Sequence, residues 1–167
     1  MSLLIVFGGL PATGKTTLAR ELARRLAATH LRIDTIEQSL KAAGLAVGPT
    51  GYVIADALAA DNLMLGRTVV ADCVNPVLAS RNGWRETAFR CAARLVEIEI
   101  ICSDLAEHRR RAESRIADIE GLIQPSWEQI TSKTYERWDR DRLVLDTAGA
   151  SLERLVDELE AHIGQMT

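Results

Sequence analysis

A glycine-rich run near the start of the chain restricts the fold more than any other feature of the sequence. It reads GLPATGKT over residues 9–16 and fits the pattern G-x-x-x-x-G-K-[ST] at every defined position. An apolar run, LLIVFGG over 3–9, precedes it, and a stretch with helical apolar spacing over 14–28 follows it. A buried strand, a glycine-rich turn and a helix in this order predict a loop whose backbone N–H groups surround phosphate groups.

The residue types in this loop indicate a nucleoside triphosphate as the ligand. Lys15 can reach the β- and γ-phosphates, and Thr16 can offer its hydroxyl group to Mg²⁺. The chain has no guanine-reading N-K-x-D sequence, which favours ATP over GTP. The residues of this loop that we expect to bind the nucleotide are Gly9, Ala12, Thr13, Gly14, Lys15, Thr16 and Thr17.

The rest of the chain alternates between patterns typical of strands and of helices. Strands are expected over 3–9, 31–33, 68–72, 95–102 and 142–148, and helices over 14–28, 35–43, 52–66, 76–93, 104–115, 126–138 and 151–163. This alternation predicts a parallel sheet with right-handed crossovers and helices on both faces. The chain has 167 residues and neither an internal repeat nor a linker, so we expect one α/β domain over 1–167.

Composition narrows the classes of function. The formal net charge of −3 argues against a broad polyanion-binding surface, although a local basic patch stays open. No apolar run approaches the ~20 residues that span a bilayer, and the N-terminal run lacks the basic flank of a signal peptide. Cys73, Cys91 and Cys102 form no metal-like cluster, so we expect a cytoplasmic protein without a membrane partner.

Acidic residues follow two of the expected strands. Ligands of an open parallel sheet bind outside the carboxyl ends of its strands, which makes Asp34 and Asp72 candidates. Asp72 could hold the Mg²⁺ shell, and Asp34 could accept the proton of an attacking hydroxyl group. Two simpler roles stay open, because Asp72 could cap the next loop and Asp34 with Glu37 resembles a helix capping box.

An arginine-rich segment, EHRRRAESR over 107–115, supplies the candidate cations. Arg111 and Arg115 lie four residues apart on one helical face and could stabilise charge on a transferring phosphoryl group. The alternative is a solvated helix face paired with Glu107 and Glu113.

The end of the last strand supplies two further candidates for nucleotide binding. Asp146 and Thr147 form a tight loop there that could pack against the adenine. Alternatively, Asp146 and Ser151 could simply start the final helix.

These pieces together resemble the small P-loop kinases related to adenylate, shikimate and gluconate kinases. The chain looks most similar to the group that includes the 5′-hydroxyl polynucleotide kinase domain and chloramphenicol phosphotransferase. The resemblance covers nearly the whole chain and rests on GGLPATGKTT, LRIDTIEQSL, VVADCVNP, EIEIICSDLAEHRRRAESR and LVLDTAGASLE.

The resemblance implies a three-layer P-loop NTPase fold with a five-stranded parallel sheet in the order 2-3-1-4-5. It also implies an acceptor cap at about 35–66 and a helical lid at about 108–125. In such kinases the acid after the second strand is the base or hydroxyl orienter, which falls on Asp34. The acid near metal and acceptor falls on Asp72, and the two lid arginines fall on Arg111 and Arg115.

The expected acceptor cap contains few basic groups. Residues 34 to 66 include four acids and one base, Lys41. A nucleoside monophosphate acceptor normally needs arginines for its phosphate, and only Arg81 and Arg85 could replace them. A polynucleotide would need still more cationic surface.

We therefore expect an ATP-dependent kinase that uses Mg²⁺ and phosphorylates a hydroxyl group of an uncharged or cationic small molecule. A 5′-hydroxyl kinase acting on nucleic acid stays open as an alternative. A nucleotide-dependent switch without an acceptor is the third interpretation. The sequence predicts no oligomeric state.

Overall fold

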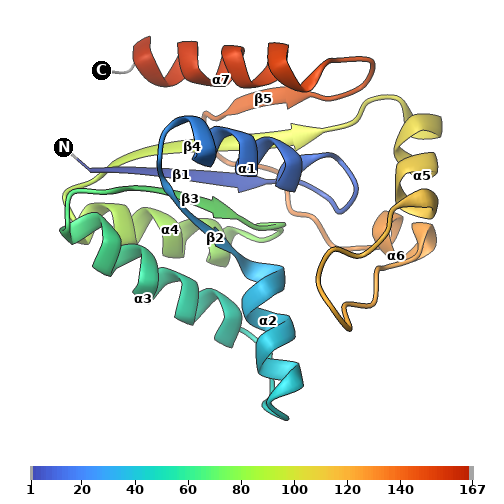
Figure 1. Cartoon of the computed structure of the whole chain (residues 1–167), viewed down its shortest axis with the longest axis horizontal. Helices are drawn as coiled ribbons and strands as arrows, with labels where there is room; N and C mark the ends of the chain where they lie inside the picture. The colour runs from blue at the N-terminus through green and yellow to red at the C-terminus, as the bar shows by residue number, and fades with distance from the viewer. Residues whose placement is uncertain (1, 166–167) are drawn as a thin grey trace.

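Five parallel strands form the centre of the protein, shown in Figure 1 from a computed structural model that describes residues 2–165. The strands are β1 (Leu3–Gly8), β2 (Thr29–Arg32), β3 (Thr68–Asp72), β4 (Arg94–Ile101) and β5 (Leu143–Asp146), arranged in the order β2-β3-β1-β4-β5. Phe7 of β1 is in register with Asp72 of β3 and Ile98 of β4. The expected parallel sheet in the order 2-3-1-4-5 is confirmed.

Helices cover both faces of the sheet and its carboxyl end. They are α1 (Lys15–Arg25), α2 (Ile33–Ala42), α3 (Thr50–Met64), α4 (Leu78–Arg90), α5 (Leu105–Ser114), α6 (Trp127–Thr131) and α7 (Leu152–Gln165). α1 and α7 pack against one face, and α3 and α4 pack against the other. Figure 1 shows α5 and α6 beyond the carboxyl ends of the strands and α2 projecting from the end of β2. Within residues 2–165, no helix is both long and apolar enough to cross a membrane.

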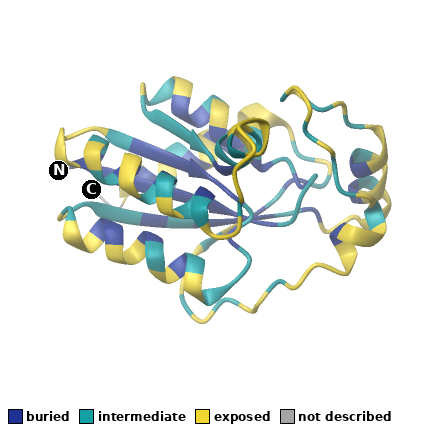
Figure 2. Cartoon of the chain, turned by 90° about the horizontal axis from the view of Figure 1, so that it is seen from below, coloured by how far each residue is buried: buried dark blue, intermediate teal, exposed yellow. Residues whose placement is uncertain are grey.

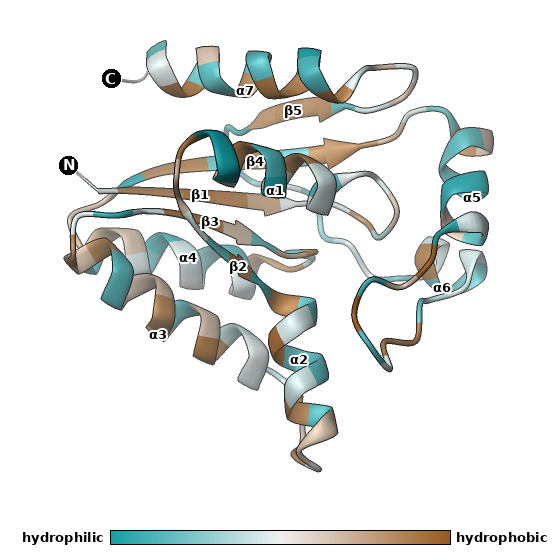
Figure 3. Cartoon of the chain, in the orientation of Figure 1, coloured by the Kyte–Doolittle hydropathy of each residue, from teal (hydrophilic) through white to brown (hydrophobic). Residues whose placement is uncertain are grey.

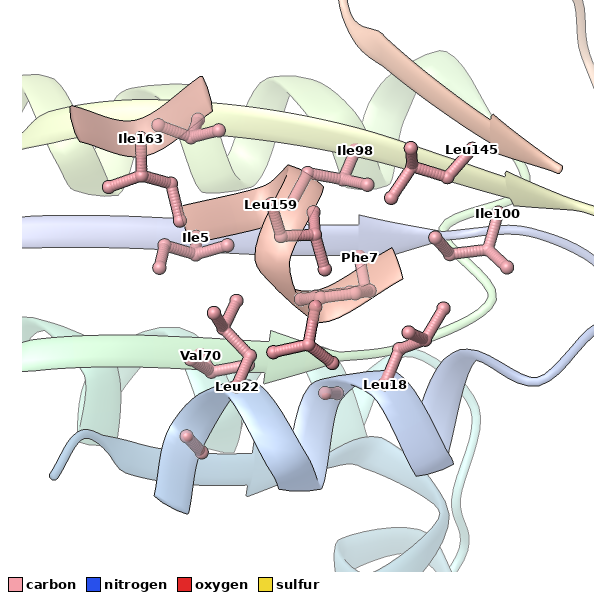
Figure 4. Close-up of a cluster of buried hydrophobic side chains, with 14 of the residues drawn as sticks. Ile5, Phe7, Leu18, Leu22, Val70, Ile98, Ile100, Leu145, Leu159 and Ile163 are labelled. Carbon is pink, nitrogen blue, oxygen red and sulfur yellow. The ribbon is translucent and has the colours of Figure 1, made fainter. Parts of the chain in front are cut away.

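Alternate residues of the strands build a separate hydrophobic core on each face. On one side Phe7 of β1 packs with Leu22 of α1 and Leu159 of α7 (Figure 4). On the other side Val6 packs with the fully buried Trp84 of α4. Figure 2 shows buried strands between helices with exposed outer faces, and Figure 3 shows that the strands are mainly hydrophobic. Burial on both faces explains why these strands are continuous apolar runs in the sequence.

The expected helix over 126–138 is wrong, because α6 ends at Thr131 and residues 132–142 have no regular structure. Arg81 of α4, whose side chain is fully buried, instead contacts this irregular segment. Its guanidinium donates to the carbonyl oxygens of Glu136 at 2.9 Å and Arg137 at 3.2 Å, and it lies 4.2 Å from the ring centre of Trp138. These contacts hold the connection between α6 and β5 against α4 and give its buried carbonyl groups a hydrogen-bond donor.

Asp56 of α3 is a half-buried acid at the contact between α3 and α4. Its Oδ1 atom is buried without a hydrogen-bond partner, and a Cβ at Gly83 of α4 would lie 3.3 Å from its Oδ2 atom. Burial raises the pKa of Asp56 to about 6, and Arg90 and Thr87 offset only part of this effect. An acid whose pKa rises on folding stabilises the folded state at low pH, and that stabilisation is lost as the pH rises through about 6.

Asp56→Asn is therefore expected to raise the free energy of unfolding at pH 8 by about 1–2 kcal/mol, with solvent screening allowed for. The gain should nearly vanish at pH 4, where the carboxyl group of the folded protein is already protonated. Thermal unfolding of both proteins from pH 4 to pH 8 measures the difference. Asp61→Asn, at an exposed position of the same helix, is the control. A gain for Asp56→Asn that does not change with pH would contradict the assignment.

Candidate active site

A cavity of about 830 Å³ opens at the carboxyl ends of the strands. Its walls come from the glycine-rich loop and α1, from α2 and the start of α3, from the loop after β5, and from residues between α5 and α6. We call residues 115–125, which form most of that last connection, the lid segment. The volume lies within the range of small-molecule sites, about 300–1,000 Å³, and the position is the one expected for an open parallel sheet.

Gly9 gives the glycine-rich loop its shape. Its φ angle of 137° is in the region that favours glycine, and a Cβ there would lie 2.2 Å from the carbonyl oxygen of Ile100. Any other residue would collide with β4, so only glycine allows the chain to leave β1 in this direction. Gly14, with a φ angle of 99°, immediately precedes α1. The loop therefore directs the N-terminus of α1 at the cavity.

Lys15 is buried at the base of the cavity, where its Nζ atom donates to the carbonyl oxygen of Leu10 at 3.2 Å. Burial lowers the pKa of Lys15, and the nearby carboxylates of Asp72 and Asp34 oppose this shift. An ammonium group has three donors, so Lys15 retains N–H groups that could bind a phosphate oxygen.

Arg111 of α5 links this helix to the glycine-rich loop and to the loop after β5. It donates to the hydroxyl group of Thr147 at 2.7 Å and to its carbonyl oxygen at 2.9 Å, and it pairs with Glu107 at 2.5 Å. The Thr147 hydroxyl in turn donates to the carbonyl oxygen of Thr13 at 2.7 Å. The expected alternative of an ion pair with Glu107 is thus present, and Arg111 is held rigidly beside the glycine-rich loop.

Asp146 joins the loops after β4 and β5. Its Oδ1 atom accepts from the backbone N–H groups of Ser103 and Ala148, each at 3.0 Å. The side chain of Ser103, together with these two N–H groups, lowers the pKa of Asp146. Ser151 accepts from the backbone N–H of Arg154 at 3.3 Å at the start of α7. Of the predicted pair, Thr147 lines the cavity, whereas the Asp146 carboxylate is occupied by backbone groups.

Arg115 lines the same cavity but differs from Arg111 in its contacts. Its Nε and Nη2 atoms are buried and have no hydrogen-bond partner within the described chain. Burial lowers the pKa of Arg115, and Asp34 opposes the shift. Buried donors without partners are costly, so this guanidinium is set up to bind an anion that enters the cavity.

Asp72 is a buried acid at the end of β3. Its Oδ2 atom has no hydrogen-bond partner and lies 3.5 Å from Nε2 of His30 and 3.9 Å from Nε of Arg32. Burial alone would raise the pKa of Asp72, but His30, Lys15 and Thr16 together outweigh it and lower the pKa. An unpaired carboxylate oxygen near the Thr16 hydroxyl suits Mg²⁺, which keeps much of its water and needs few protein ligands. Residues 2–165 contain no cluster of three or more His, Cys, Asp and Glu suited to a metal.

Asp34 lies in the first turn of α2, with its side chain half exposed in the cavity. The Nη2 atom of Arg32 lies 3.7 Å from it, and Nη1 of the same guanidinium lies 2.8 Å from Asp118 of the lid segment. Arg20 of α1 also binds Asp118, at 2.5 Å. The hydrogen bond from Arg32, assisted by that from Arg20, lowers the pKa of Asp118 to about 2. Arg32 therefore lies among Asp34, Asp72 and the lid segment.

The structure brings most of the predicted site residues to this cavity. Those that line it are Ala12, Gly14, Lys15, Thr16, Thr17, Asp34, Arg111, Arg115 and Thr147. The capping-box alternative for Asp34 and Glu37 is wrong, because Arg32 is the N-cap of α2 and no side chain caps that helix. Within residues 2–165, the carboxylate of Asp34 therefore accepts no capping hydrogen bond from the backbone of α2.

Arg32 and His30 of the site were not singled out from the sequence, and Glu37 was considered there only as part of a capping box. Arg32 carried a usable signal, since it is a charged residue at the end of β2, two positions before Asp34, and so lies at the same edge of the sheet. His30 ends up beside Asp72 only because β2 pairs with β3. No local pattern reveals that contact.

Arg81 and Arg85, the suggested ligands for an acceptor phosphate, do not line the cavity. Arg81 is fully buried and its donors go to backbone carbonyl groups. Arg85 is exposed on α4. The expectation that this pair could hold an acceptor phosphate is therefore wrong.

Comparisons with known proteins agree with this architecture. The model of the AAA_33 family, described as an AAA domain, matches residues 4–142. A structure from Chloroflexus aurantiacus, described as a proposed kinase, shares 23% identity with a TM-score of 0.78, over 99% of this chain and 98% of that one. A gluconokinase from Sinorhizobium meliloti shares 19% identity with a TM-score of 0.69, over 98% and 93%.

The Mycobacterium tuberculosis APS kinase, solved with AMPPNP and APS, shares 19% identity with a TM-score of 0.72, over 98% of each chain. No curated protein matches the sequence. At these identities the structural similarity shows a common fold.

Asp118→Asn is expected to loosen the lid segment, because Arg20 and Arg32 lose the charge that holds residues 115–125 against α1 and β2. The loss should be about 1 kcal/mol, equivalent to roughly fivefold faster amide hydrogen exchange in that segment. Hydrogen exchange read by mass spectrometry measures it. Glu120→Gln, which changes an exposed acid of the same segment, should leave the exchange unchanged. Equal exchange in Asp118→Asn and the unmutated protein would contradict the role of this ion pair.

Proposed function

The chain belongs to the AAA_33 family of AAA domains, and we propose that it is an ATP-dependent phosphotransferase acting on a hydroxyl group of a small molecule. One observation carries the proposal. The half-exposed carboxylate of Asp34 shares a cavity with Lys15 and with the unpaired guanidinium of Arg115. A phosphate held by the two cations would lie near an acid able to take a proton from its attacker.

The reaction is a single in-line exchange of bonds. The acceptor oxygen forms a bond to the γ-phosphorus, and the bond from that phosphorus to the oxygen of the β-phosphate breaks, which releases ADP. The proton of the acceptor hydroxyl passes to the carboxylate of Asp34. Lys15 and Arg115 stabilise the charge on the phosphoryl oxygens, and Arg111 with Thr147 holds the nucleotide side of the cavity in shape.

Thr16 and Asp72 are the residues that would hold Mg²⁺. The partnerless Oδ2 atom of Asp72 and its proximity to Thr16 fit this role. When bound, the ion supplies positive charge to the β- and γ-phosphate oxygens. Arg32 would keep Asp72 and Asp34 in place, and its ion pair with Asp118 would hold the lid segment against β2.

A small-molecule acceptor is supported by the neighbours and by the cavity. The similar structures include a gluconokinase, an APS kinase and a sugar kinase, whose names refer to small substrates. A nucleic-acid acceptor would need more cationic surface, to which the fully buried Arg81 does not contribute. A nucleotide switch would have no use for an acid at Asp34. The free thiols of Cys73, Cys91 and Cys102 agree with the proposed cytoplasmic location.

The direct test offers γ-labelled ATP with hydroxylated metabolites, antibiotics and 5′-hydroxyl oligonucleotides. We expect labelled small molecule, and we expect Asp34→Asn to lower that transfer by about 10²–10⁴-fold with little change in ATP affinity. Asp61→Asn, outside the cavity, is the matched control. Unchanged transfer by Asp34→Asn would rule out its role as base, and label on the oligonucleotide alone would favour the nucleic-acid alternative.

Arg115→Ala is expected to lower kcat by roughly 10²–10³-fold while the Kd for ATP changes only a few-fold, because its donors meet charge that develops during transfer. Arg110→Ala removes an exposed arginine from α5, the helix that ends just before Arg115, and should change neither value. Equal losses in kcat and in ATP affinity would make Arg115 a ground-state clamp instead.

A further inference from the structure

Glu37 is the one acid of the cavity for which the proposed reaction has no use. It lies three residues after Asp34 on α2, so both side chains occupy one face of the helix. Its carboxylate is half buried, and it makes no hydrogen bond or ion pair with any residue in the range 2–165. Burial raises the pKa of Glu37, and Asp34 adds to the shift.

Gly51 of α3 holds Glu37 in a defined position. A Cβ at Gly51 would lie 2.7 Å from Cγ of Glu37 and 3.1 Å from its Oε1 atom. The absence of a side chain at this buried glycine lets the carboxylate pack between α2 and α3 instead of moving in solvent. Lys41 and Lys133 lower the pKa of Glu37 from a distance, but both are exposed and neither pairs with it.

Part of the cavity wall that the lid segment forms is apolar. Ile116 and Ile123 are 92% and 90% exposed, although both line the cavity with Leu122 and Pro125. Figure 3 shows hydrophobic stretches along this connection between α5 and α6. Large aliphatic side chains exposed around a cavity indicate a ligand with an apolar body that would cover them.

We infer that the acceptor is an amino alcohol with an apolar body, whose protonated amine pairs with Glu37 while its hydroxyl group meets Asp34. This inference rests on the proposed function. Residues one helical turn apart have Cβ atoms about 5–6 Å from each other, which fits an amine and a hydroxyl group separated by two or three carbon atoms. The apolar body packs against Ile116 and Ile123. Glu37 is thus the residue that selects a cationic acceptor over a neutral or acidic one.

Three probes with the same benzyl body test this selection: phenylalaninol, 3-phenylpropane-1,2-diol and 3-phenyllactate. They carry an amine, a neutral hydroxyl group and a carboxylate, respectively. Isothermal titration calorimetry in the presence of ADP and Mg²⁺ gives their dissociation constants. We expect phenylalaninol to bind about tenfold more tightly than the diol, and 3-phenyllactate to bind most weakly.

Glu37→Gln should abolish the preference for phenylalaninol and leave the Kd for ATP unchanged. Gly51→Ala, which forces Glu37 aside without removing its charge, should also reduce the preference. Glu120→Gln should retain it. The inference would be overturned if the preference survived in Glu37→Gln, or if the diol or 3-phenyllactate bound more tightly than phenylalaninol. It would also be overturned if phenylalaninol showed no binding at about 10 mM.

Failure of this inference and failure of the proposed function give different results. Calorimetry requires no turnover, so a preference for phenylalaninol that Glu37→Gln removes supports the inference even when no label moves from ATP. Such a result would contradict the proposed phosphoryl transfer but would leave the role of Glu37 supported. Transfer of label to neutral or acidic compounds, with no preference for amines, would support the proposed function and overturn the role of Glu37.

Discussion

The five strands run parallel with helices against both faces of the sheet, and this burial decides where polar chemistry can occur. Side chains in the middle of β1 and β3 face only hydrophobic cores. The one charged residue of these two strands, Asp72, therefore lies where its strand ends. Gly9 allows the glycine-rich loop to form at this edge. Its backbone passes so close to Ile100 that any Cβ would collide there and prevent the turn toward α1. Asp72 and Thr147 reach the same edge from β3 and β5.

Charge pairing then divides the cations around the cavity into two kinds. Arg111 has a carboxylate at 2.5 Å, and Arg20 and Arg32 share that of Asp118 at 2.5 and 2.8 Å, so each is already in an ion pair, although Nε of Arg32 has no partner within residues 2–165. Lys15 binds one backbone carbonyl group, and Arg115 has buried donors without partners. A phosphate entering the cavity would gain most from these two residues. The balanced arginines are better suited to holding the loops and the lid segment in place.

Features that depend on local pattern could be predicted from the sequence, whereas those that depend on distant partners could not. The glycine-rich loop and the strand ending in Asp72 belong to the first kind, whereas the sheet order was expected only from the resemblance to small P-loop kinases. Arg81 belongs to the second, because its burial depends on carbonyl groups 55 residues further along the chain. Helical spacing also could not predict the difference between Arg111 and Arg115, because it depends on Thr147, which accepts a hydrogen bond from Arg111 and none from Arg115. Asp34 was found by its position after a strand, although the start of α2 lies one residue before it.

We propose that Lys15, Arg115 and Asp34 act together on one transferring phosphoryl group. A crystal structure with ADP, Mg²⁺ and aluminium fluoride, which imitates that group, is the decisive experiment. In it we expect Lys15 and the Nε and Nη2 atoms of Arg115 to contact the fluoride ligands. We also expect the Asp34 carboxylate to lie across the aluminium from ADP, within hydrogen-bond distance of the oxygen in the attacking position. An Arg115 that stays without contacts to the fluoride, or an Asp34 turned away from that oxygen, would contradict the proposal.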